Sequence, residues 1–431
     1  MQSFFANSLM LAGFLAMGFG PVVPAADWTQ FRGPNGSAVS QETGLPTSWS
    51  ETENLKWKTK LPGYGASSPI TWKDKVFVTC YSGYGTDNGG SQSDLMRHVV
   101  CVDRNSGNIL WDTKVKPYLP EDRAGGFLSG HGYASSTPVT DGERVYVFFG
   151  KTGVLAFDMN GKQLWKTSVG TGSAIRGWGS GSSPILYKDK VIVNASAEGL
   201  AIVALDKTNG KQIWKAKADG LEGSWCTPVV VKGKDGMDEI VVAAPYEFWA
   251  LNPKTGKLLW YADALPRAPI CTSLVAHDGV VYAIAGRSNQ AAAVRAGGRG
   301  DVTKTHVLWK KQVGSYVTSP VYHKGHLYWV SDRGIAYCVD AKTGNTVYRG
   351  RLSGARSLYA SAVAADGKIY AVSRRGGTFV LAAKPKFEQL KRNQFASDDS
   401  LFNATPAISN GCLFLRSNKY LYCLKNSADG K

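Results

Sequence analysis

Aromatic and charged side chains that could bind a ligand recur in the segments that lead into a series of short apolar runs. Aromatic faces stack on planar or sugar rings, and arginines pair with carboxylate, sulfate or phosphate groups. The candidate binding residues are Tyr64, His131, Tyr133, Arg176, Trp178, Glu222, Trp225, Arg267, Tyr316, Arg356, Tyr359 and Phe402. If the fold gathers these segments, they could bind an anionic or ring-bearing ligand; alternatively, they only fill space.

The spacing of residues in the sequence reveals no catalytic motif. No Ser, His and Asp can be combined into a triad from their positions, and no glycine-rich loop opens a phosphate-binding helix. His323 and His326 lie close together, but no nearby Cys or carboxylate completes a metal shell, so a solvated turn is expected. We assign no catalytic residue and no metal ligand from the sequence.

The seven cysteines differ in their expected roles. Cys226 and Cys271 begin strands of neighbouring repeats at nearly equivalent positions, so they could form a disulfide in an oxidising compartment. The remaining cysteines fall on or beside predicted strands: Cys80, Cys101, Cys338, Cys412 and Cys423. Of these, Cys101, Cys338 and Cys423 take a position filled by Ala in other repeats, which predicts small buried side chains. The connectivity stays open.

A turn signal with an aromatic residue after it recurs along the chain. Its copies are Asp103/Gly107/Trp111, Asp206/Gly210/Trp214, Asn252/Gly256/Trp260 and the shorter Asp158/Gly161/Trp165. Asx side chains cap tight turns, and Gly adopts the positive φ that lets two strands reverse. Each copy therefore predicts a hairpin whose outgoing strand carries the aromatic residue.

The spacing of these units predicts the architecture. Successive tryptophans lie 46 to 54 residues apart, from Trp57 to Trp309, which fits one four-stranded propeller blade per unit. Alternating β-rich runs occur at residues 76–80, 145–149, 191–195, 240–244, 281–285, 327–331, 369–373 and 413–417. These runs predict an all-β fold, an eight-bladed propeller.

Each of these runs is preceded by a strand that begins with a hydroxyl residue. The eight hydroxyl residues are Ser68, Thr137, Ser183, Thr227, Ser273, Ser319, Ser361 and Thr405. We expect them to satisfy backbone groups where the blades converge. The last blade lacks an outgoing strand and residues 55–60 lack a blade, so the two are expected to pair and close the ring.

The stretch from Ala204 to Trp214 resembles the tryptophan-docking repeat of pyrroloquinoline-quinone-type propellers. That superfamily contains quinoprotein alcohol dehydrogenases and the related outer-membrane protein assembly propeller. The resemblance implies the fold, whereas its function stays open between enzyme and scaffold. The enzymes hold their quinone between an indole and a disulfide of adjacent cysteines, with calcium on Glu and Asn; this chain has no Cys-Cys pair. Trp178, Arg176 and Glu222 are suitable residue types but do not match the enzyme motif residue by residue.

Composition and the first residues indicate export. An apolar run at residues 9–19 is followed by small residues, as in a signal peptide cleaved near Ala26, and no Cys stands there to carry a lipid. No later run approaches the roughly 18 apolar residues of a membrane span. The net charge of +17 favours anionic partners, and export argues against nucleic acid. A periplasmic or secreted product is expected.

The chain divides into a signal peptide (1–26), an irregular lead-in (27–54), the propeller (55–425) and a tail (426–431). Three insertions interrupt the repeats, at residues 82–97, 116–132 and 286–305. Long insertions on a rigid scaffold often carry recognition. Because the second insertion leads directly into His131 and Tyr133, we expect it to form a lid.

Three functional hypotheses follow. The preferred one is a monomeric, non-catalytic scaffold of the cell envelope that binds a protein or an anionic glycan at the channel mouth, without a cofactor. The first alternative is a dehydrogenase that uses pyrroloquinoline quinone with calcium, and the second is a polysaccharide-binding module.

Overall fold

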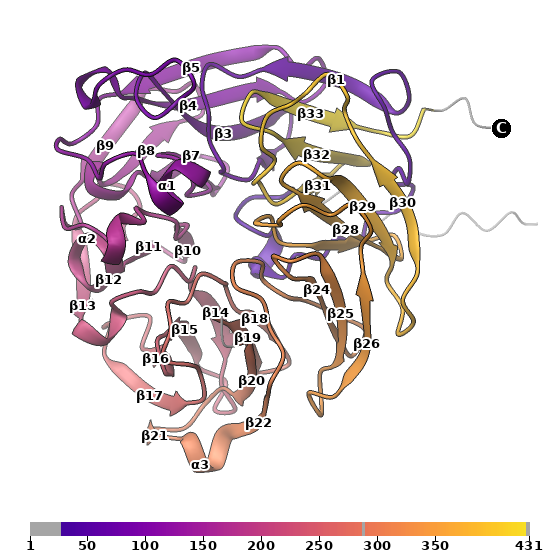
Figure 1. Cartoon of the computed structure of the whole chain (residues 1–431). Coiled ribbons are helices and arrows are strands. Elements are labelled where there is room, and N and C mark those ends of the chain that lie inside the picture. The colour runs from indigo at the N-terminus through magenta and orange to yellow at the C-terminus, as the bar shows by residue number, and fades with distance from the viewer. Residues whose placement is uncertain (1–26, 287–288, 428–431) are drawn as a thin grey trace, which may run out of the picture.

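The computed structural model describes residues 27–286 and 289–427. In this part of the chain, eight sheets surround a central axis (Figure 1). The predicted all-β, eight-bladed propeller is therefore confirmed. The predicted signal peptide lies outside the described residues.

The first four blades follow one another along the chain. Blade 1 contains β2 (Ile70–Trp72), β3 (Lys75–Ser82), β4 (Met96–Asp103) and β5 (Ile109–Val115). Blade 2 contains β6 (Val139–Thr140), β7 (Arg144–Phe148), β8 (Val154–Asp158) and β9 (Gln163–Thr167). Blade 3 contains β10 (Ile185–Tyr187), β11 (Lys190–Ala195), β12 (Ala201–Asp206) and β13 (Gln212–Lys217). Blade 4 contains β14 (Val229–Lys232), β15 (Asp238–Ala244), β16 (Glu247–Leu251), β17 (Leu258–Asp263) and the added β21 (Gly300–Asp301).

The other four blades complete the ring. Blade 5 contains β18 (Val275–His277), β19 (Val280–Ala285), β20 (Gln290–Arg295) and β22 (Val307–Lys311). Blade 6 contains β23 (Val321–His323), β24 (His326–Val330), β25 (Ile335–Asp340) and β26 (Thr346–Arg351). Blade 7 contains β27 (Val363–Ala365), β28 (Lys368–Ser373), β29 (Gly377–Ala382) and β30 (Gln389–Asn393). Blade 8 contains β31 (Ala407–Ser409), β32 (Cys412–Arg416), β33 (Tyr420–Leu424) and β1 (Leu55–Lys60).

Short helices lie between the strands. The α-helices are α1 (Gly126–His131), α2 (Ser196–Gly199) and α3 (Thr303–His306). The 3-10 helices are η1 (Pro34–Gly36), η2 (Gln92–Asp94), η3 (Gly150–Thr152), η4 (Ile175–Gly177) and η5 (Asp219–Leu221). Among the described residues, no helix has the length and apolar character that crossing a bilayer requires.

Tryptophans on the outer strands join each blade to the next. Along β13, Trp214 is the one buried residue between exposed neighbours. Five indoles donate hydrogen bonds to a turn of the following blade: Trp57 to Arg104 O (2.9 Å), Trp111 to Met159 O (3.1 Å), Trp165 to Lys207 O (3.2 Å), Trp214 to Pro253 O (3.0 Å) and Trp309 to Ala341 O (3.0 Å). Gly107 has φ +80°, and a Cβ there would lie 2.7 Å from the Trp57 ring. Glycine is thus required by both conformation and contact.

The hydroxyl residues form the inner belt of the ring. Seven successive backbone N–H groups, from Ser68 to Ser361, each donate to the hydroxyl of the next blade, at 2.8 to 3.1 Å. The prediction that these hydroxyls satisfy backbone groups is therefore confirmed.

The first and last strands close the ring. β1 pairs antiparallel with β33, with Lys60 opposite Tyr420 and Trp57 opposite Cys423. The buried Arg416 joins blade 8 to blade 1, because its guanidinium donates to Ser67 O (2.8 Å) and Thr79 O (2.7 Å). The predicted closure is confirmed.

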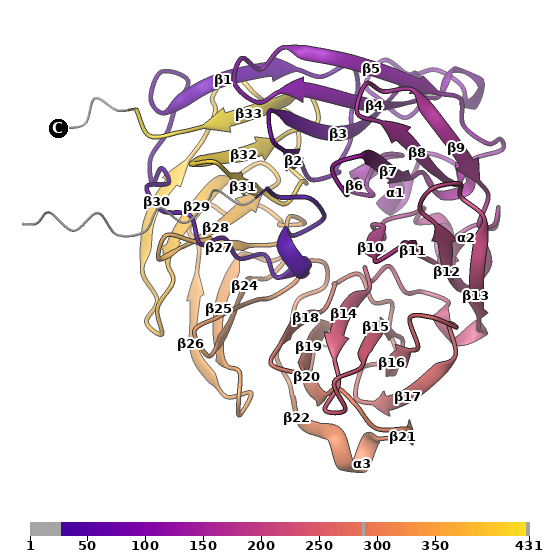
Figure 2. The same ribbon diagram turned by 180° about the vertical axis from the view of Figure 1, so that it is seen from behind.

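The lead-in crosses one face of the propeller, which we call the rear face (Figure 2). Trp28 and Trp49 are buried there, as expected of anchors. Arg32 is also buried, and its guanidinium donates to the carbonyls of Leu274 (2.9 Å) and Pro320. Phe31 reaches the central channel from this side. The opposite face carries α1, and we call it the mouth face.

Candidate binding site at the channel mouth

Helix α1 places an aromatic side chain in the mouth of the channel. The helix belongs to the insertion at residues 116–132 and lies at the inner side of the ring (Figure 1). The ring of Phe127 is 4.7 Å from that of Trp178 and 6.3 Å from that of Tyr359, which is nearly parallel to it. Tyr316 meets Phe127 edge-on at 5.7 Å. The insertion therefore covers the mouth, as predicted for a lid.

Beneath α1 lies a cavity of about 160 Å³. Phe127 bounds it at the mouth and Phe31 at the rear, with the hydroxyl belt, Trp178 and Trp225 along its wall. The lining contains no Asp, Glu, Lys or Arg. Its chemistry is aromatic and hydroxylic, which suits an uncharged ligand better than an ion.

His131, at the end of α1, is held as a neutral imidazole. Burial lowers its pKa to about 4. The carbonyl of Trp178 can only accept, so Nε2–H donates to it (3.0 Å), which leaves Nδ1 to accept from the hydroxyl of Ser135 (2.5 Å). The ring therefore fixes the end of α1 against blade 3.

Five predicted binding residues meet around Phe127: His131, Trp178, Trp225, Tyr316 and Tyr359. The Trp225 ring lies 5.2 Å from that of Trp178, and its indole donates to Gly179 O (2.7 Å). Phe127 itself was not among the predicted residues. Its only sequence signal was its place inside an insertion.

The other predicted residues lie outside this cluster. Arg176, Glu222, Arg267 and Arg356 are exposed on the mouth side, and Arg176 lies 5.7 Å from the Trp178 ring. The remaining three serve structure: Tyr64 donates to Asp87 (2.5 Å), Tyr133 donates to Asp122 O (2.7 Å), and Phe402 packs 6.0 Å from Tyr422.

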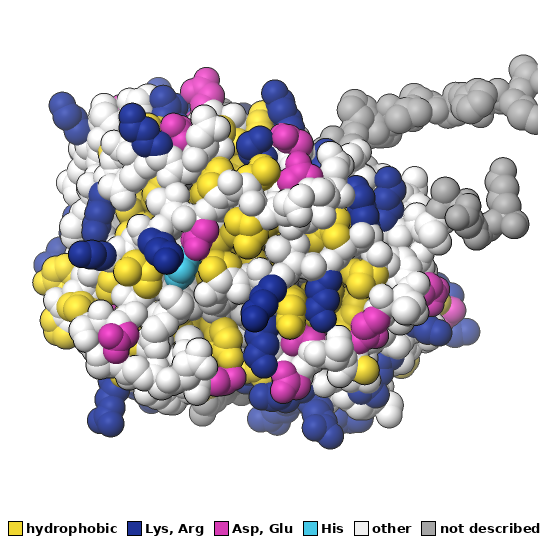
Figure 3. All heavy atoms as spheres, turned by 90° about the horizontal axis from the view of Figure 1, so that it is seen from above, with side chains coloured by type: hydrophobic (Ala, Val, Ile, Leu, Met, Phe, Trp, Pro, Cys, Tyr) yellow, Lys and Arg dark blue, Asp and Glu magenta, His cyan; other side chains and the backbone are white. Residues whose placement is uncertain are grey.

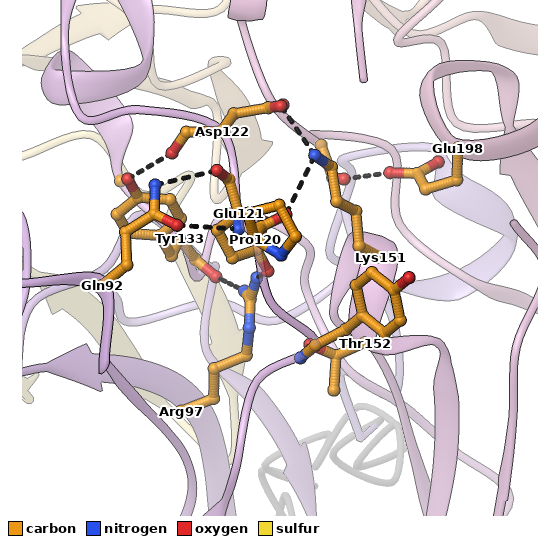
Figure 4. A network of polar contacts seen from close by, with 12 residues as sticks. Gln92, Arg97, Pro120, Glu121, Asp122, Tyr133, Lys151, Thr152 and Glu198 are labelled. Carbon is orange, nitrogen blue, oxygen red and sulfur yellow. Dashed lines mark hydrogen bonds and ion pairs between the residues drawn. The ribbon is translucent and has the colours of Figure 1, made fainter. Parts of the chain in front are cut away.

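The strap that leads to α1 is held by buried charges (Figure 4). Arg97 of β4 forms a buried ion pair with Glu121 and donates to Tyr133 O. Gln92 exchanges two hydrogen bonds with the backbone of Glu121, at 2.9 and 3.1 Å. Lys151 pairs with Asp122 at 2.9 Å. These contacts join residues 120–122 to blades 1 and 2.

The end of α1 is also held by residues of blades 7 and 8. The carbonyl of Gly130 accepts hydrogen bonds from Arg374 and from Asn403, both at 2.8 Å. Arg374 also donates to Asn403 (2.9 Å) and lies 4.3 Å from the Tyr359 ring. Blades 7 and 8 thus hold the tip of the lid.

A buried carboxyl group lies beside the strap. Glu198 of α2 accepts a hydrogen bond from Ser180, and burial raises its pKa to about 7. The folded protein therefore binds this proton more tightly than the unfolded chain. The stability that the neutral carboxyl contributes is complete below pH 4.5 and is lost as the pH rises through about 7.

Replacing Glu198 with Gln should abolish this loss. We expect Glu198→Gln to match the parent protein near pH 4.5 and to be more stable at pH 8 by about 1–3 kcal/mol, as measured by urea unfolding at both pH values. Glu222→Gln, which removes an exposed carboxylate on the same face, is the control. An equal difference between Glu198→Gln and the parent at both pH values would contradict this assignment.

The predicted disulfide is not formed between the described residues Cys226 and Cys271. Cys226 is a buried thiol whose Sγ donates to Thr227 O (3.3 Å), and burial raises its pKa to about 11. Cys271 instead lines the central cavity. Equivalent positions in neighbouring blades were therefore not enough to predict a disulfide.

The structure also assembles a row of side chains that spacing did not reveal. Ser82 donates to His98 Nε2 (2.9 Å), and His98 Nδ1–H donates to Asp112 (2.9 Å). The three lie on β3, β4 and β5 of blade 1. His98 is buried, and none of the described cavities is lined by the three residues. We interpret the row as a link between strands.

The mouth does not fit pyrroloquinoline quinone with calcium. Phe127 occupies the space between Trp178 and Tyr359 that a planar cofactor would need. Calcium prefers carboxylate oxygens, and the cavity lining contains none. Arg176 and Glu222, the expected residue types, are exposed. In the ranges 27–286 and 289–427, no group of His, Cys, Asp or Glu could hold a metal.

Comparison with known proteins places these features in context. A family model described as outer membrane protein assembly factor BamB matches residues 96–350. Tetrathionate hydrolase from Acidithiobacillus ferrooxidans is 24% identical over 294 residues, which cover 63% of this chain and 53% of that protein. The chain therefore spans about half the length of that relative.

Two solved structures share the fold. BamB from Moraxella catarrhalis aligns with a TM-score of 0.62 at 14% identity, covering 88% of this chain and 98% of that one. The quinohemoprotein alcohol dehydrogenase ADHIIG from Pseudomonas putida HK5 aligns with a TM-score of 0.64 at 12% identity, covering 94% and 81%. The fold is thus similar to that of both an assembly factor and an oxidoreductase.

Proposed function

The chain belongs to the family of the outer membrane protein assembly factor BamB, and from this premise we propose that it is a monomeric, non-catalytic binding propeller of the cell envelope. It is exported and uses its mouth face to bind a protein partner. The predicted export signal and the family support this location together.

The position of Phe127 carries the proposal. The rings of Trp178 and Tyr359 could bind a planar cofactor between them, but they contact Phe127 of the same chain instead. The ring centroids of Phe127 and Trp178 are 4.7 Å apart. The lid is fastened to blades 1, 2, 7 and 8 by contacts that include the buried Arg97–Glu121 pair. A covered channel inside a rigid ring favours recognition through the exposed surface of the mouth face over chemistry within the channel.

Charge supports an acidic partner. The net charge of the chain is +17. On the rim of the propeller seen in Figure 3, Lys and Arg side chains are spread widely, with hydrophobic and some acidic side chains between them. A dispersed positive charge attracts acidic surfaces and speeds encounter, whereas the local arrangement of side chains decides specificity. An anionic glycan is the competing ligand at the mouth face.

Photo-crosslinking in cells tests the proposal. A benzophenone side chain at Glu222 or Arg267, both exposed on the mouth face, should crosslink to an envelope protein that mass spectrometry identifies. The same group at Lys254, on a turn of the rear face, should not. Equal crosslinking from both faces, or purification with neither an envelope protein nor an acidic glycan, would overturn the proposal.

A further inference from the structure

The outer parts of blades 5 and 6 separate on the mouth face and leave a cleft. β22 and β26 diverge in Figure 1. A cleft of about 510 Å³ runs outward from Phe127, Tyr316 and Tyr359 to β25 and β26 of blade 6, with Asn289 and Gly314 of blade 5 also in its lining. The cleft is thus continuous with the aromatic cluster at the mouth.

One wall of the cleft consists of apolar and cationic side chains in pairs. On β25 and β26, Ile335 lies opposite Arg351 and Tyr337 opposite Arg349. Gly350, between the two arginines, lies against Phe387 of blade 7. Because side chains alternate across a strand, both arginines face the cleft.

The apolar part of this wall is rigid. Tyr337 stacks on the buried Trp329 with ring centroids 4.9 Å apart, and Arg349 lies 5.4 Å from the Tyr337 ring. Stacking orients the guanidinium and leaves its edge for a carboxylate. The wall is therefore organised before any ligand binds.

The cleft has an excess of positive charge. Arg333, Arg349 and Arg351 line it and are exposed, and within the described chain no carboxylate pairs with them. Arg351 donates to the carbonyl of Arg333 (3.4 Å). Asp332 is the one acidic residue in the lining, and its carboxylate accepts from the backbone of Tyr316 (3.2 Å). An acidic ligand would supply the missing partners.

We propose that this cleft binds an extended acidic peptide of the partner, with carboxylates at alternate positions. Arg349 and Arg351 are two residues apart on one strand, which places them about 7 Å apart, the distance between alternate side chains of an extended peptide. Ile335 and Tyr337 would contact apolar residues between the carboxylates. The inference rests on the proposed function, since it names the chemistry of the protein that the mouth face binds.

Fluorescence anisotropy with a labelled eight-residue peptide of alternating Glu and Val tests the inference on the purified full chain. We expect saturable binding that weakens with added salt, and no binding of the Gln/Val counterpart. The double variant Arg349→Gln/Arg351→Gln should weaken binding by roughly tenfold or more. Lys342→Gln, which removes one charge from a rear turn of the same blade, should leave binding unchanged.

Several outcomes would overturn the inference. These are equal binding of both peptides, an affinity that survives the double variant in protein whose thermal unfolding is unchanged, or preferential binding of an oligogalacturonate over the peptide. If the peptide does not bind while Glu222 and Arg267 still crosslink to an envelope protein, only the proposed role of the cleft is overturned. If the peptide binds but no crosslink to an envelope protein forms, only the proposed scaffold role is overturned.

Discussion

Replacing Arg97 with Met is expected to lower the free energy of unfolding by about 3–5 kcal/mol, because it leaves the buried carboxylate of Glu121 without its cation. The substitution also removes a hydrogen bond to Tyr133 O. The strap at residues 120–122 should loosen first, since this pair joins it to blade 1. Urea unfolding measures the loss, and hydrogen exchange of residues 116–132 locates it.

The double variant Arg97→Met/Glu121→Met separates the ion pair from the volume of the side chains. Removing both charges leaves no buried charge unpaired, so most of the stability should return. If the double variant is as unstable as Arg97→Met, the loss came from packing, and the interpretation that the Arg97–Glu121 ion pair holds the strap to blade 1 is wrong.

Replacing Trp214 with Ala should cost about 3–5 kcal/mol. The indole is buried between blades 3 and 4, donates to Pro253 O (3.0 Å) and lies flat on Gly256. Its removal leaves a cavity at a blade junction as well as an unpaired carbonyl. The shift of the urea midpoint measures this effect.

Trp214→Phe is the matched control, because it keeps most of the apolar contact and loses the indole N–H. We expect a smaller cost, about 1 kcal/mol for the hydrogen bond and a comparable amount for packing. A loss as large as that of Trp214→Ala would mean that hydrogen bonding, and not burial, dominates the junction between blades.

Trp260 does not make the contact that its repeat predicts. The Asn252/Gly256/Trp260 copy predicts docking like the others, yet Trp260 donates to the buried Glu239 (2.8 Å). The predicted insertion at residues 286–305 is wrong in part, because residues 290–295 form β20 of blade 5. Residues 296–306, which contain β21 and α3, replace the turn on which Trp260 would dock. Glu239 also accepts from Gly297 of this insertion (3.1 Å). A local pattern cannot report that its partner in the next blade is missing.

The turn signals, the alternating runs and the hydroxyl residues predict the eight blades, the tryptophans on the outgoing strands, the hydroxyl belt and the closure by β1 and β33. These features repeat, and each depends on turn chemistry and strand alternation within about ten residues. The sequence also shows that aromatic residues and arginines recur in the segments that lead into the inner strands. Turn residues and strand alternation can be recognised in the sequence because they depend on residues close to one another in the chain.

Which side chains meet across the ring depends on how the blades pack. Phe127 contacts Tyr359 across the channel. Arg97 pairs with Glu121, which lies in the insertion at residues 116–132. Arg349 and Arg351 line an open cleft because blades 5 and 6 separate beside them. Contacts between blades depend on how eight sheets pack around one axis, and no short segment encodes that packing.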